Sequence, residues 1–447
     1  MRSVYYPKIL IVGNSFDKKS GGGITLTNLF KGWEKENIAV AASGINELDF
    51  NICEKYYRLG SSERHIRFPV NKIGKKSFVE SGNISTTQKT DFQSISYVRK
   101  RSMLGDFFRS KYYKIYDIIG LEHYSYRLKI STEFKNWVKE FNPDIIYCQL
   151  STLETILFIN DLHFQFKKPI AIHFMDDWPE SITNRQKGVF KKYWKKIIGR
   201  DLRYLLSNAT ILMSISEAMS EAYYYRYGLK FTPYHNPITI EEWLPYSKND
   251  WSLTGTFRII YTGRIGTANN KSILFVSSII NTLNKSSIKI KLDIYTPNAS
   301  ADIVAPYLDY EGVEIKPPVP YEFMPELLSK YDLLLLPLDF DEAGINFARY
   351  SMPTKASEYM ISGTPILVFA SMQTALAKYA TKDGWAYVVT NYEISTLLSA
   401  IKELRSNQLL RINLARKAQK IAIRNEDAKI VRENFRKSFS LNKNKSC

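Results

Sequence analysis

The chain has 447 residues, 45% of them hydrophobic, which suits two domains of about 200 residues each and excludes a disordered protein. No stretch approaches the ~18 consecutive apolar residues of a membrane-spanning helix, and Met1–Pro7 lacks the apolar run of a signal peptide. Cys53, Cys148 and Cys447 are far apart without CxxC spacing, which argues against a disulfide framework or a zinc cluster. We therefore expect a cytoplasmic protein.

The net charge of +18 is unevenly distributed along the chain. Residues 1–240 contain 36 Lys and Arg against 23 Asp and Glu, a net of +13, which leaves +5 for residues 241–447. This excess indicates that the N-terminal half contacts anions such as lipid head groups, an acidic glycan or nucleic acid. Nucleic acid is the least favoured partner, because the sequence contains no aromatic platform motif or compact basic module.

The first predicted strand covers residues 8–13 and leads into a glycine-rich loop. The loop ends in Gly21, Gly22 and Gly23, and an apolar helix is expected from Ile24. The order of strand, glycine loop and helix is Rossmann-like, but the GxGxxG spacing is missing, which weakens a nicotinamide or flavin assignment. Consecutive glycines at a helix start allow close backbone approach to a ligand, and a flexible turn without a ligand is the alternative.

Strands are next predicted at residues 38–42, 144–147 and 169–173. Residues 55–135, which separate the first two of these, are basic, aromatic and rich in Ser and Thr. We expect this segment to be an irregular insertion of helices and long loops rather than regular βα units.

Polar side chains stand where the third of these strands ends. His173 closes the strand, and Asp176 and Asp177 follow it. Because ligands bind beyond the carboxyl ends of parallel strands, His173 is a candidate to hydrogen-bond a sugar hydroxyl or a phosphate. The two acids are candidates to steer or deprotonate an acceptor. The alternative is that all three satisfy polar groups of their own loop.

A basic amphipathic helix is predicted within residues 185–203. Pairs of Lys and Arg flank an apolar stripe at helical spacing, formed by Phe190, Trp194, Ile197 and Ile198. Such a helix can lie on an anionic membrane surface. More often a stripe of this kind packs on the protein's own core with a solvated basic face, and the sequence leaves both interpretations open.

A second strand–glycine–helix opening appears halfway along the chain. After a polar stretch that reads as a linker up to Thr256, a strand is predicted at residues 257–263 and a helix at residues 272–283. The repeat predicts an α/β protein with two Rossmann-like doubly wound domains. We place the first domain at residues 1–240, the second at 241–425, and a helix at 426–447 that packs back on the first.

The stretch 333–370 contains a buried strand at its start, then a polar loop carrying Asp339, Asp341 and Glu342. A helix-start signal follows the loop: Ser351 and Thr354 can cap, and Pro353 suits a first turn, while Gly363 ends the segment. The N-terminus of this helix would offer free N–H groups to a phosphate beyond the sheet edge.

Charged side chains near that helix start sharpen the expectation. Lys355 lies in the first turn, where an anion would compensate it, and Glu358 is placed to accept the hydroxyls of a ribose. A surface Lys–Glu pair worth about 0.3–0.5 kcal/mol is the alternative. Arg264 and Lys271 flank a loop that would project from the same sheet edge. Two cations and two helix N-termini could hold a pyrophosphate and stabilise it as it departs.

These motifs together resemble the family-4-type GT-B glycosyltransferases, which transfer a sugar from a nucleotide donor with retention of configuration. The resemblance covers most of the chain but is patchy over residues 55–135. Its carriers are Gly21–Gly23, His173, Ile215–Met219, Asn236-Pro237-Ile238, Tyr261–Arg264 with Lys271, and Met352–Lys355 followed by Glu358–Met360, Gly363 and Pro365.

The resemblance implies a GT-B architecture of two domains facing across a cleft, with the site between them and no metal or other cofactor. Arg264 and Lys271 would hold the donor diphosphate, Glu358 the ribose, and His173 the transferring sugar. The backbone around Ser351, Met352, Pro353, Thr354 and Lys355 would cradle the donor, and Gly22 and Gly23 would close over its phosphates.

The implied partners are a nucleotide sugar, a glycan or lipid-linked glycan acceptor, and an anionic membrane contacted peripherally. The implied activity is retaining hexosyl transfer, and the implied setting is bacterial surface polysaccharide synthesis. The sequence departs from the family pattern at Tyr350, where an acid eight positions before Glu358 is common, and Asp339, Asp341 and Glu342 are candidate replacements. The Arg264–Lys271 loop is also longer than usual. A nucleotide-sugar epimerase of the same fold and a catalytically degenerate scaffold subunit remain alternatives.

Overall fold

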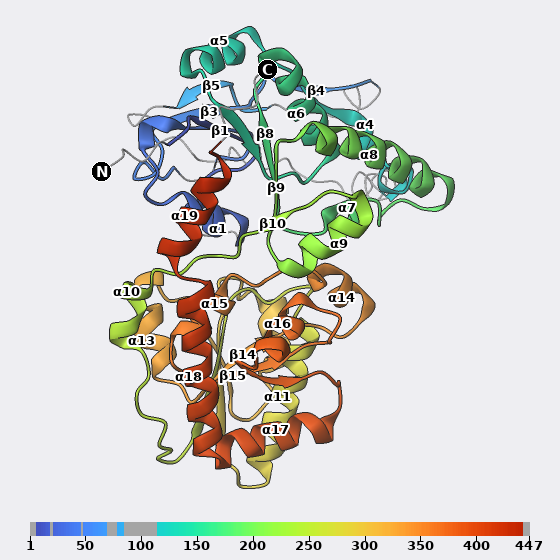
Figure 1. Cartoon of the computed structure of the whole chain (residues 1–447). Helices are drawn as coiled ribbons and strands as arrows, with labels where there is room; N and C mark the ends of the chain where they lie inside the picture. The colour runs from blue at the N-terminus through green and yellow to red at the C-terminus, as the bar shows by residue number, and fades with distance from the viewer. Residues whose placement is uncertain (1–5, 18–20, 46–47, 69–77, 85–113, 441–447) are drawn as a thin grey trace, which may run out of the picture. The chain divides into compact units, whose positions relative to one another are not determined.

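A computed structural model of the whole chain describes residues 6–17, 21–45, 48–68, 78–84 and 114–440. The chain forms two compact units, each with its own parallel sheet (Figure 1). Unit 1 comprises Met1–Ser214, Ser220–Pro233 and Phe435–Cys447, and unit 2 comprises Ile215–Met219 and Tyr234–Asn434. The division therefore falls near residues 214, 233 and 434. The sequence had suggested limits at 240 and 425.

The sheet of unit 1 consists of short strands in the order β5-β3-β2-β1-β7-β8-β9-β10. All neighbours are parallel except β5, which pairs antiparallel with β3 at the edge. The central strands are continuous apolar runs because helices cover both faces of a parallel sheet. The strands are β1 (Ile9–Val12), β2 (Ile38–Ala42), β3 (Lys55–Arg58), β5 (Gly82–Ile84), β7 (Ile145–Cys148), β8 (Ile170–Phe174), β9 (Ile211–Ser214) and β10 (Thr232–Pro233).

One sequence expectation is corrected in this sheet. The segment 55–135 was predicted to be irregular, but β3 and β5 extend the sheet within it, and β4 (Arg64–Ile66) pairs with β6 (Tyr126–Leu128). The buried Tyr56 and Tyr57 explain why β3 forms, because aromatic residues favour strands where they pack on a half-buried surface. Parts of this segment, residues 69–77 and 85–113, lie outside the described residues.

Local caps fix several helices of unit 1. Ser131 accepts a hydrogen bond from the N–H of Phe134 at the start of α5, and Thr152 forms a capping box with Thr155 at the start of α6. The helices are α1 (Gly21–Phe30), η1 (Lys35–Asn37), α4 (Leu121–Ser125), α5 (Thr132–Phe141), α6 (Leu153–Phe166), α7 (Trp178–Ser181), α8 (Gly188–Asn208) and most of α9 (Glu217–Tyr227). The last turn of α19 (Ala428–Ser438) also belongs to unit 1, where the Phe435 ring packs 5.2 Å from that of Phe30.

Unit 2 contains a fully parallel sheet in the order β13-β12-β11-β14-β15-β16. Its strands are β11 (Phe257–Thr262), β12 (Ile290–Tyr295), β13 (Val313–Lys316), β14 (Leu333–Pro337), β15 (Ile366–Phe369) and β16 (Tyr387–Val389). Its helices are α10 (Ile240–Trp243), η3 (Leu244–Tyr246), α11 (Asn270–Lys285), α12 (Ala301–Val304), η4 (Ala305–Tyr307), η5 (Tyr321–Phe323), α13 (Met324–Ser329), α14 (Glu342–Ala348), α15 (Lys355–Ile361), α16 (Ala375–Asp383), α17 (Ile394–Ser406) and α18 (Gln408–Asn425).

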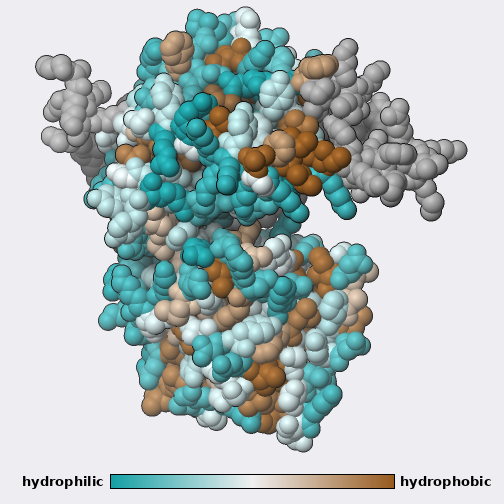
Figure 2. Space-filling view, turned by 90° about the vertical axis from the view of Figure 1, so that its right-hand side faces the viewer, coloured by the Kyte–Doolittle hydropathy of each residue, from teal (hydrophilic) through white to brown (hydrophobic). Residues whose placement is uncertain are grey.

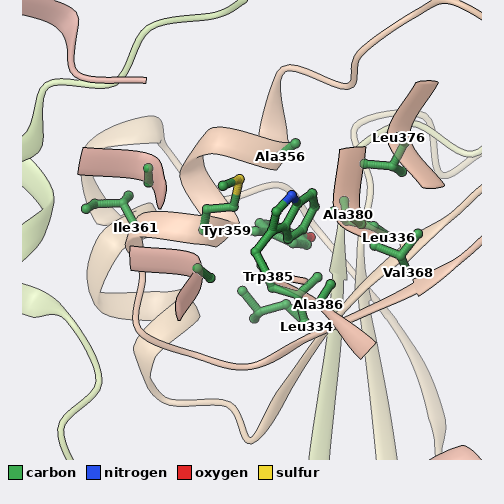
Figure 3. Close-up of a cluster of buried hydrophobic side chains, with 14 of the residues drawn as sticks. Leu334, Leu336, Ala356, Tyr359, Ile361, Val368, Leu376, Ala380, Trp385 and Ala386 are labelled. Carbon is green, nitrogen blue, oxygen red and sulfur yellow. The ribbon is translucent and has the colours of Figure 1, made fainter. Parts of the chain in front are cut away.

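Alternating side chains divide the core of unit 2 between the two faces of its sheet. On β14, Leu334 and Leu336 pack in one cluster with Tyr359 and Trp385 (Figure 3), whereas Leu333 and Leu335 pack in the other. The first cluster is covered by α15, α16 and α18, and the second by α11 and α17. A doubly covered sheet of this kind is what the strand–helix repeat predicted.

The polar stretch before Phe257, read from the sequence as a linker, is an integral part of unit 2. It contains α10 and buries the side chains of Trp243 and Trp251. The indole N–H of Trp251 donates to the carbonyl of Gly363, and Arg411 donates to the carbonyl of Trp251. Two tryptophans in a polar stretch were the signal that this segment packs rather than connects. None of the described helices is both long and apolar enough to span a membrane.

Candidate active site

The candidate residues of unit 2 gather at the point where the strand order of its sheet reverses. β11 and β14 are neighbours in the middle of the sheet, but β12 and β13 continue to one side and β15 and β16 to the other. The loop after β11 carries Arg264 and Lys271, and the loop after β14 leads to Lys355 and Glu358. In open α/β sheets, ligands bind outside the carboxyl ends of the strands at this switch point.

The loop after β11 is fixed through its backbone. The carbonyl of Arg264 accepts hydrogen bonds from the hydroxyl of Tyr261 (2.6 Å) and from the amide of Asn269 (3.0 Å). Asn298 bonds both the N–H and the carbonyl of Ile265. The exposed guanidinium of Arg264 has no hydrogen-bond or ion-pair partner among the described residues. Arg264 is therefore a cation on a rigid loop, free to bind an anion.

The start of α15 is tied to the end of β11. The Lys355 ammonium donates to the carbonyl of Thr262 (2.6 Å) and lies 4.2 Å from the centre of the Tyr261 ring. The hydroxyl of Tyr359 accepts a hydrogen bond from the N–H of Thr262 (2.9 Å). Two side chains one helical turn apart thus hold α15 beside the Arg264 loop. The predicted convergence of the Glu358 helix on the Arg264 loop is seen in these contacts.

Gly263 allows this arrangement. Its φ of +129° lies in the region that favours glycine, and a Cβ at this position would be 2.4 Å from the Lys355 ammonium nitrogen. The glycine therefore lets the lysine lie directly against the backbone beside Arg264.

The carboxylate of Glu358 is buried behind Lys355. It is 8% exposed, and burial raises its pKa to about 7, against the opposing effects of the Lys355 charge and of hydrogen bonding to Tyr321. Burial likewise lowers the pKa of Lys355 to about 8. No salt bridge joins the two side chains among the described contacts, so the surface-pair alternative does not fit. Two titratable groups shifted toward neutrality mark this part of unit 2 as a functional-site candidate.

Lys271 lies at the start of α11, and its ammonium pairs with Asp341 at 2.6 Å. Both side chains are exposed, so an incoming anion would compete with a solvated carboxylate. The N-terminus of α11 is already occupied, because the buried Asp339 accepts the N–H of Ser272 at 2.7 Å. The expectation that two helix N-termini hold a pyrophosphate is therefore corrected: a carboxylate of the protein caps α11.

The polar loop after β14 also differs from the sequence expectation of irregular structure. Asp341 caps a short helix, α14, by accepting the N–H of Gly344. The sequence signal for this cap was Asp341 itself, an acid directly before a short run of helix-compatible residues. Of the candidate replacements for an acid at Tyr350, Asp339 and Asp341 thus serve as helix caps. Glu342 is exposed in the first turn of α14.

The segment Ser351–Thr354 is irregular and partly buried, as expected of a cradle. Ser351 donates its hydroxyl to the carbonyl of Phe347, and Met352 packs on the core of unit 2. Pro353 precedes Thr354, which occupies the N-cap position of α15 but forms no side-chain cap, contrary to the sequence expectation. Gly363 ends the segment with a φ of +77°, as a C′ glycine should.

In unit 1, Gly22 and Gly23 lie within α1 rather than in a loop before it, which corrects the predicted start at Ile24. A Cβ on Gly23 would lie 2.1 Å from the Asp17 carboxylate, and one on Gly22 would lie 3.4 Å from the Gln149 side chain. These glycines therefore accommodate side chains of the protein itself, and closure over a donor remains a prediction.

His173 lies inside β8 and is completely buried. Its Nδ1 is 2.8 Å from the Tyr147 hydroxyl, which accepts from Gln149, and Asn14 in turn donates to Gln149. Burial lowers the pKa of His173 to about 4, so the imidazole is neutral at pH 7. A polar chain thus runs from His173 to the switch point between β1 and β7. The imidazole has no exposed surface with which to touch a sugar in this structure.

The two acids after β8 differ in their surroundings. Asp177 forms a bidentate salt bridge with Arg226 (2.6 and 3.0 Å) and accepts the hydroxyl of Tyr223. Asp177 thus satisfies local groups, as the alternative interpretation held. Asp176 is exposed.

The comparisons with known proteins cover the second half of the chain by family model and nearly all of it by structure. Residues 256–407 match the family model "Glycosyl transferases group 1". The structure resembles a sucrose-phosphate synthase from Thermosynechococcus elongatus (TM-score 0.62, 12% identity, 96% of this chain and 97% of that one). It also resembles Anabaena HepE in complex with UDP and glucose (TM-score 0.59, 13%, 98% and 100%) and the trehalose-6-phosphate synthase OtsA (0.59, 11%, 97% and 99%).

The fold is GT-B. The family match lies on the unit that carries Arg264, Lys271, Lys355 and Glu358, and together with the GT-B fold it supports a glycosyltransferase. Comparison with curated protein sequences gives no match.

The candidate site includes three tyrosines to which the sequence analysis assigned no role. Tyr359 bonds α15 to the end of β11, Tyr261 fixes the loop after β11 and lies under the Lys355 ammonium, and Tyr321 lies beside Glu358. Tyr359 could have been suspected from the sequence because it follows Glu358 directly. Tyr321 could not, because it is distant from the other site residues in the chain. Among the described residues, no group of three or more His, Cys, Asp or Glu is arranged to hold a metal ion. Metal independence remains a prediction.

Proposed function

We propose that the protein is a retaining, family-4-type glycosyltransferase that transfers a hexose-type sugar from a nucleotide-sugar donor, without a metal, to a glycan or lipid-linked glycan. The setting proposed is bacterial surface polysaccharide synthesis at the cytoplasmic face of a membrane. The observation that carries the proposal is the arrangement at the switch point of unit 2. There, the unpaired Arg264 and the partly buried Lys355 lie at one strand end, with Glu358 behind them.

This arrangement suits a departing nucleoside diphosphate. The negative charge on the diphosphate grows as the bond to the sugar breaks, and preorganised cations stabilise that growing charge. Arg264 offers a planar fork for two phosphate oxygens, and Lys355 offers a compact charge whose pKa of about 8 would rise beside an anion. In this proposal Glu358 accepts hydroxyls of the ribose.

Proton transfer needs no further acid or base in this proposal. With retention of configuration, the departing phosphate can itself accept the proton of the acceptor hydroxyl. His173, neutral and buried, would then act on the sugar only through a rearrangement of its surroundings, and Lys271 would leave Asp341 to bind the diphosphate.

Removal of the Arg264 charge tests the proposal. Arg264→Ala should lower turnover of the donor by several orders of magnitude and weaken binding of nucleoside diphosphates, without lowering the melting temperature. Isothermal titration with UDP, GDP and ADP, followed by assays of donor turnover, measures both effects. Lys289→Ala is the matched control, because this exposed lysine precedes β12, at the opposite end of the strands.

Two results would contradict the proposal. One is near-normal activity of Arg264→Ala; the other is a wild-type protein that neither binds any nucleoside diphosphate nor turns over any donor. The second result would favour the scaffold alternative, which Tyr350 in place of an acid supports. Isomerised donor formed without acceptor would instead indicate an epimerase.

We also propose that the first turns of α8 contact an anionic membrane. Of the apolar stripe predicted there, Trp194 and Ile198 pack inside unit 1, with the Trp194 indole donating to the carbonyl of Ile119. Phe190, together with Val189 and Tyr193, is instead exposed, by 40%, 73% and 56% respectively. In Figure 2, brown hydrophobic surface lies beside teal hydrophilic surface on unit 1.

Charge complementarity supports an anionic membrane as the partner of this patch. Lys187, Lys191, Lys192, Lys195 and Lys196 are exposed on the same turns, and among them Lys195 pairs with Glu180. Exposed apolar side chains between lysines match a surface of anionic lipid, since each basic residue near it contributes about 1 kcal/mol.

Vesicle binding tests this contact. Co-sedimentation with vesicles of phosphatidylcholine and phosphatidylglycerol should fall at least tenfold for the double variant Lys191→Glu/Lys192→Glu and for Phe190→Ser, and should weaken with salt. Phe164→Ser is the control, because Phe164 is 75% exposed on another helix of unit 1. Equal binding of all variants would remove α8 from the interface.

A further inference from the structure

The segment Tyr350–Thr354 is held in place by two stretches that belong to unit 2 but lie outside its main sheet. The first is Ile215–Met219, which directly follows β9 and includes the first residues of α9. The second follows β10 and contains Asn236. The chain enters or leaves unit 2 at both stretches, so their contacts attach the crossing chain to the loop before α15.

Ser216 makes the first attachment. Its hydroxyl donates to the carbonyl of Tyr350 at 2.6 Å and accepts the N–H of Met219 at 3.1 Å, so it serves both the loop and the start of α9. The side chain is 1% exposed. A buried hydroxyl satisfied on both sides fixes its partners closely, because either group left alone would be unsatisfied.

Asn236 makes the second attachment. Its amide donates to the carbonyl of Thr354 at 3.2 Å, and its own carbonyl accepts the hydroxyl of Ser357 at 3.0 Å. Asn236 is 3% exposed. The two ends of the irregular segment 350–354 are therefore both held by side chains from the crossing chain, while Lys355 and Tyr359 hold the following helix to β11.

We infer that Ser216 and Asn236 are positioning residues for nucleoside diphosphate binding, acting through the loop Tyr350–Thr354. An irregular loop has no backbone ladder of its own, so its carbonyls and N–H groups keep one geometry only if other groups fix them. A loop fixed before binding loses less entropy when the ligand arrives. The inference rests on the proposed function, because it assigns these residues to the same donor site.

Nucleotide affinity tests this inference without knowledge of the acceptor. The probe is whichever of UDP, GDP and ADP binds the wild-type protein by isothermal titration. Ser216→Ala and Asn236→Ala should each weaken its binding about tenfold, the effect expected for loss of one buried hydrogen bond, and Ser216→Thr should restore it. The double variant should be less than additive, because both residues act on one loop.

A stability control separates positioning from a general loss of structure. Asn407 caps α18 by accepting the N–H of Leu410, away from the loop, so Asn407→Ala should lower the melting temperature without changing nucleotide affinity. Wild-type affinity in Ser216→Ala and Asn236→Ala would overturn the inference and leave the proposed function intact. Equal weakening in Asn407→Ala would also overturn it. Absence of binding by the wild-type protein would instead overturn the proposed function.

Discussion

At the scale of single residues, the unit 2 site depends on which charges are engaged by the protein and which are not. Arg264 is held only through its backbone, whereas Lys271 is paired with Asp341. The sequence analysis assigned both cations to the donor diphosphate. The structure distinguishes them, because only Arg264 offers its charge without first breaking an ion pair.

Gly263 permits a prediction at this scale. Gly263→Ala should displace the Lys355 ammonium from the carbonyl of Thr262 and weaken nucleoside diphosphate binding at least tenfold, since the new methyl would occupy the position of the ammonium. The strained φ should also cost about 1–2 kcal/mol of stability. Titration calorimetry and thermal denaturation measure the two effects.

Gly266→Ala is the matched control, because it adds a methyl to the same loop where nothing lies within 4 Å. Unchanged affinity in Gly263→Ala, or an equal loss in both variants, would show that the position of Lys355 does not govern binding.

At the scale of elements, an ion triad joins three parts of unit 2. His235 lies between Glu217, the first residue of α9, and Glu426, which follows α18, at 2.8 and 3.2 Å. Despite burial, the two carboxylates raise the pKa of His235 to about 10, and the pKa of Glu217 falls to about 2. The imidazolium is therefore a structural cation at neutral pH, although its sequence context of Tyr, Asn and Pro gives no sign of it.

The triad predicts a pH dependence of stability. A histidine whose pKa is raised on folding contributes stability that is complete below its unfolded pKa of about 6.5 and is lost as the pH rises toward about 10. His235→Gln should destabilise the protein at pH 6.5 by about 3 kcal/mol, because it leaves Glu426 buried without a counter-charge. The difference from the wild type should shrink as the pH increases. Chemical denaturation of both proteins from pH 6 to 10 measures it, and a difference independent of pH would refute the role of the charge.

At the scale of the whole molecule, two units with separate sheets and cores make up the GT-B fold. The cations Arg264, Lys271 and Lys355 all belong to unit 2, as do the stretches that hold the loop Tyr350–Thr354. The proposed nucleotide site therefore lies within unit 2, whereas the basic surface of α8 belongs to unit 1.

This separation predicts how a ligand affects unfolding. In differential scanning calorimetry, thermal unfolding should depart from a two-state transition, because each unit has its own core. The nucleoside diphosphate that binds should raise the melting temperature of one component by several degrees and leave the other nearly unchanged. A single two-state transition that shifts as a whole would contradict this expectation.

The sequence by itself determined the elements that repeat: apolar strands, amphipathic helices, and the loops after strands that carry Arg264 and Glu358. Such patterns are legible because the burial of a strand or helix face is written in local periodicity. Tertiary structure alone decided which polar groups are engaged. The burial of His173, the capping of α11 by Asp339, the pairing of Asp177 with Arg226 and the role of Gly23 all depend on neighbours distant in the chain. The type of a residue determines which groups it can bind, but the fold determines which groups of the protein lie within its reach.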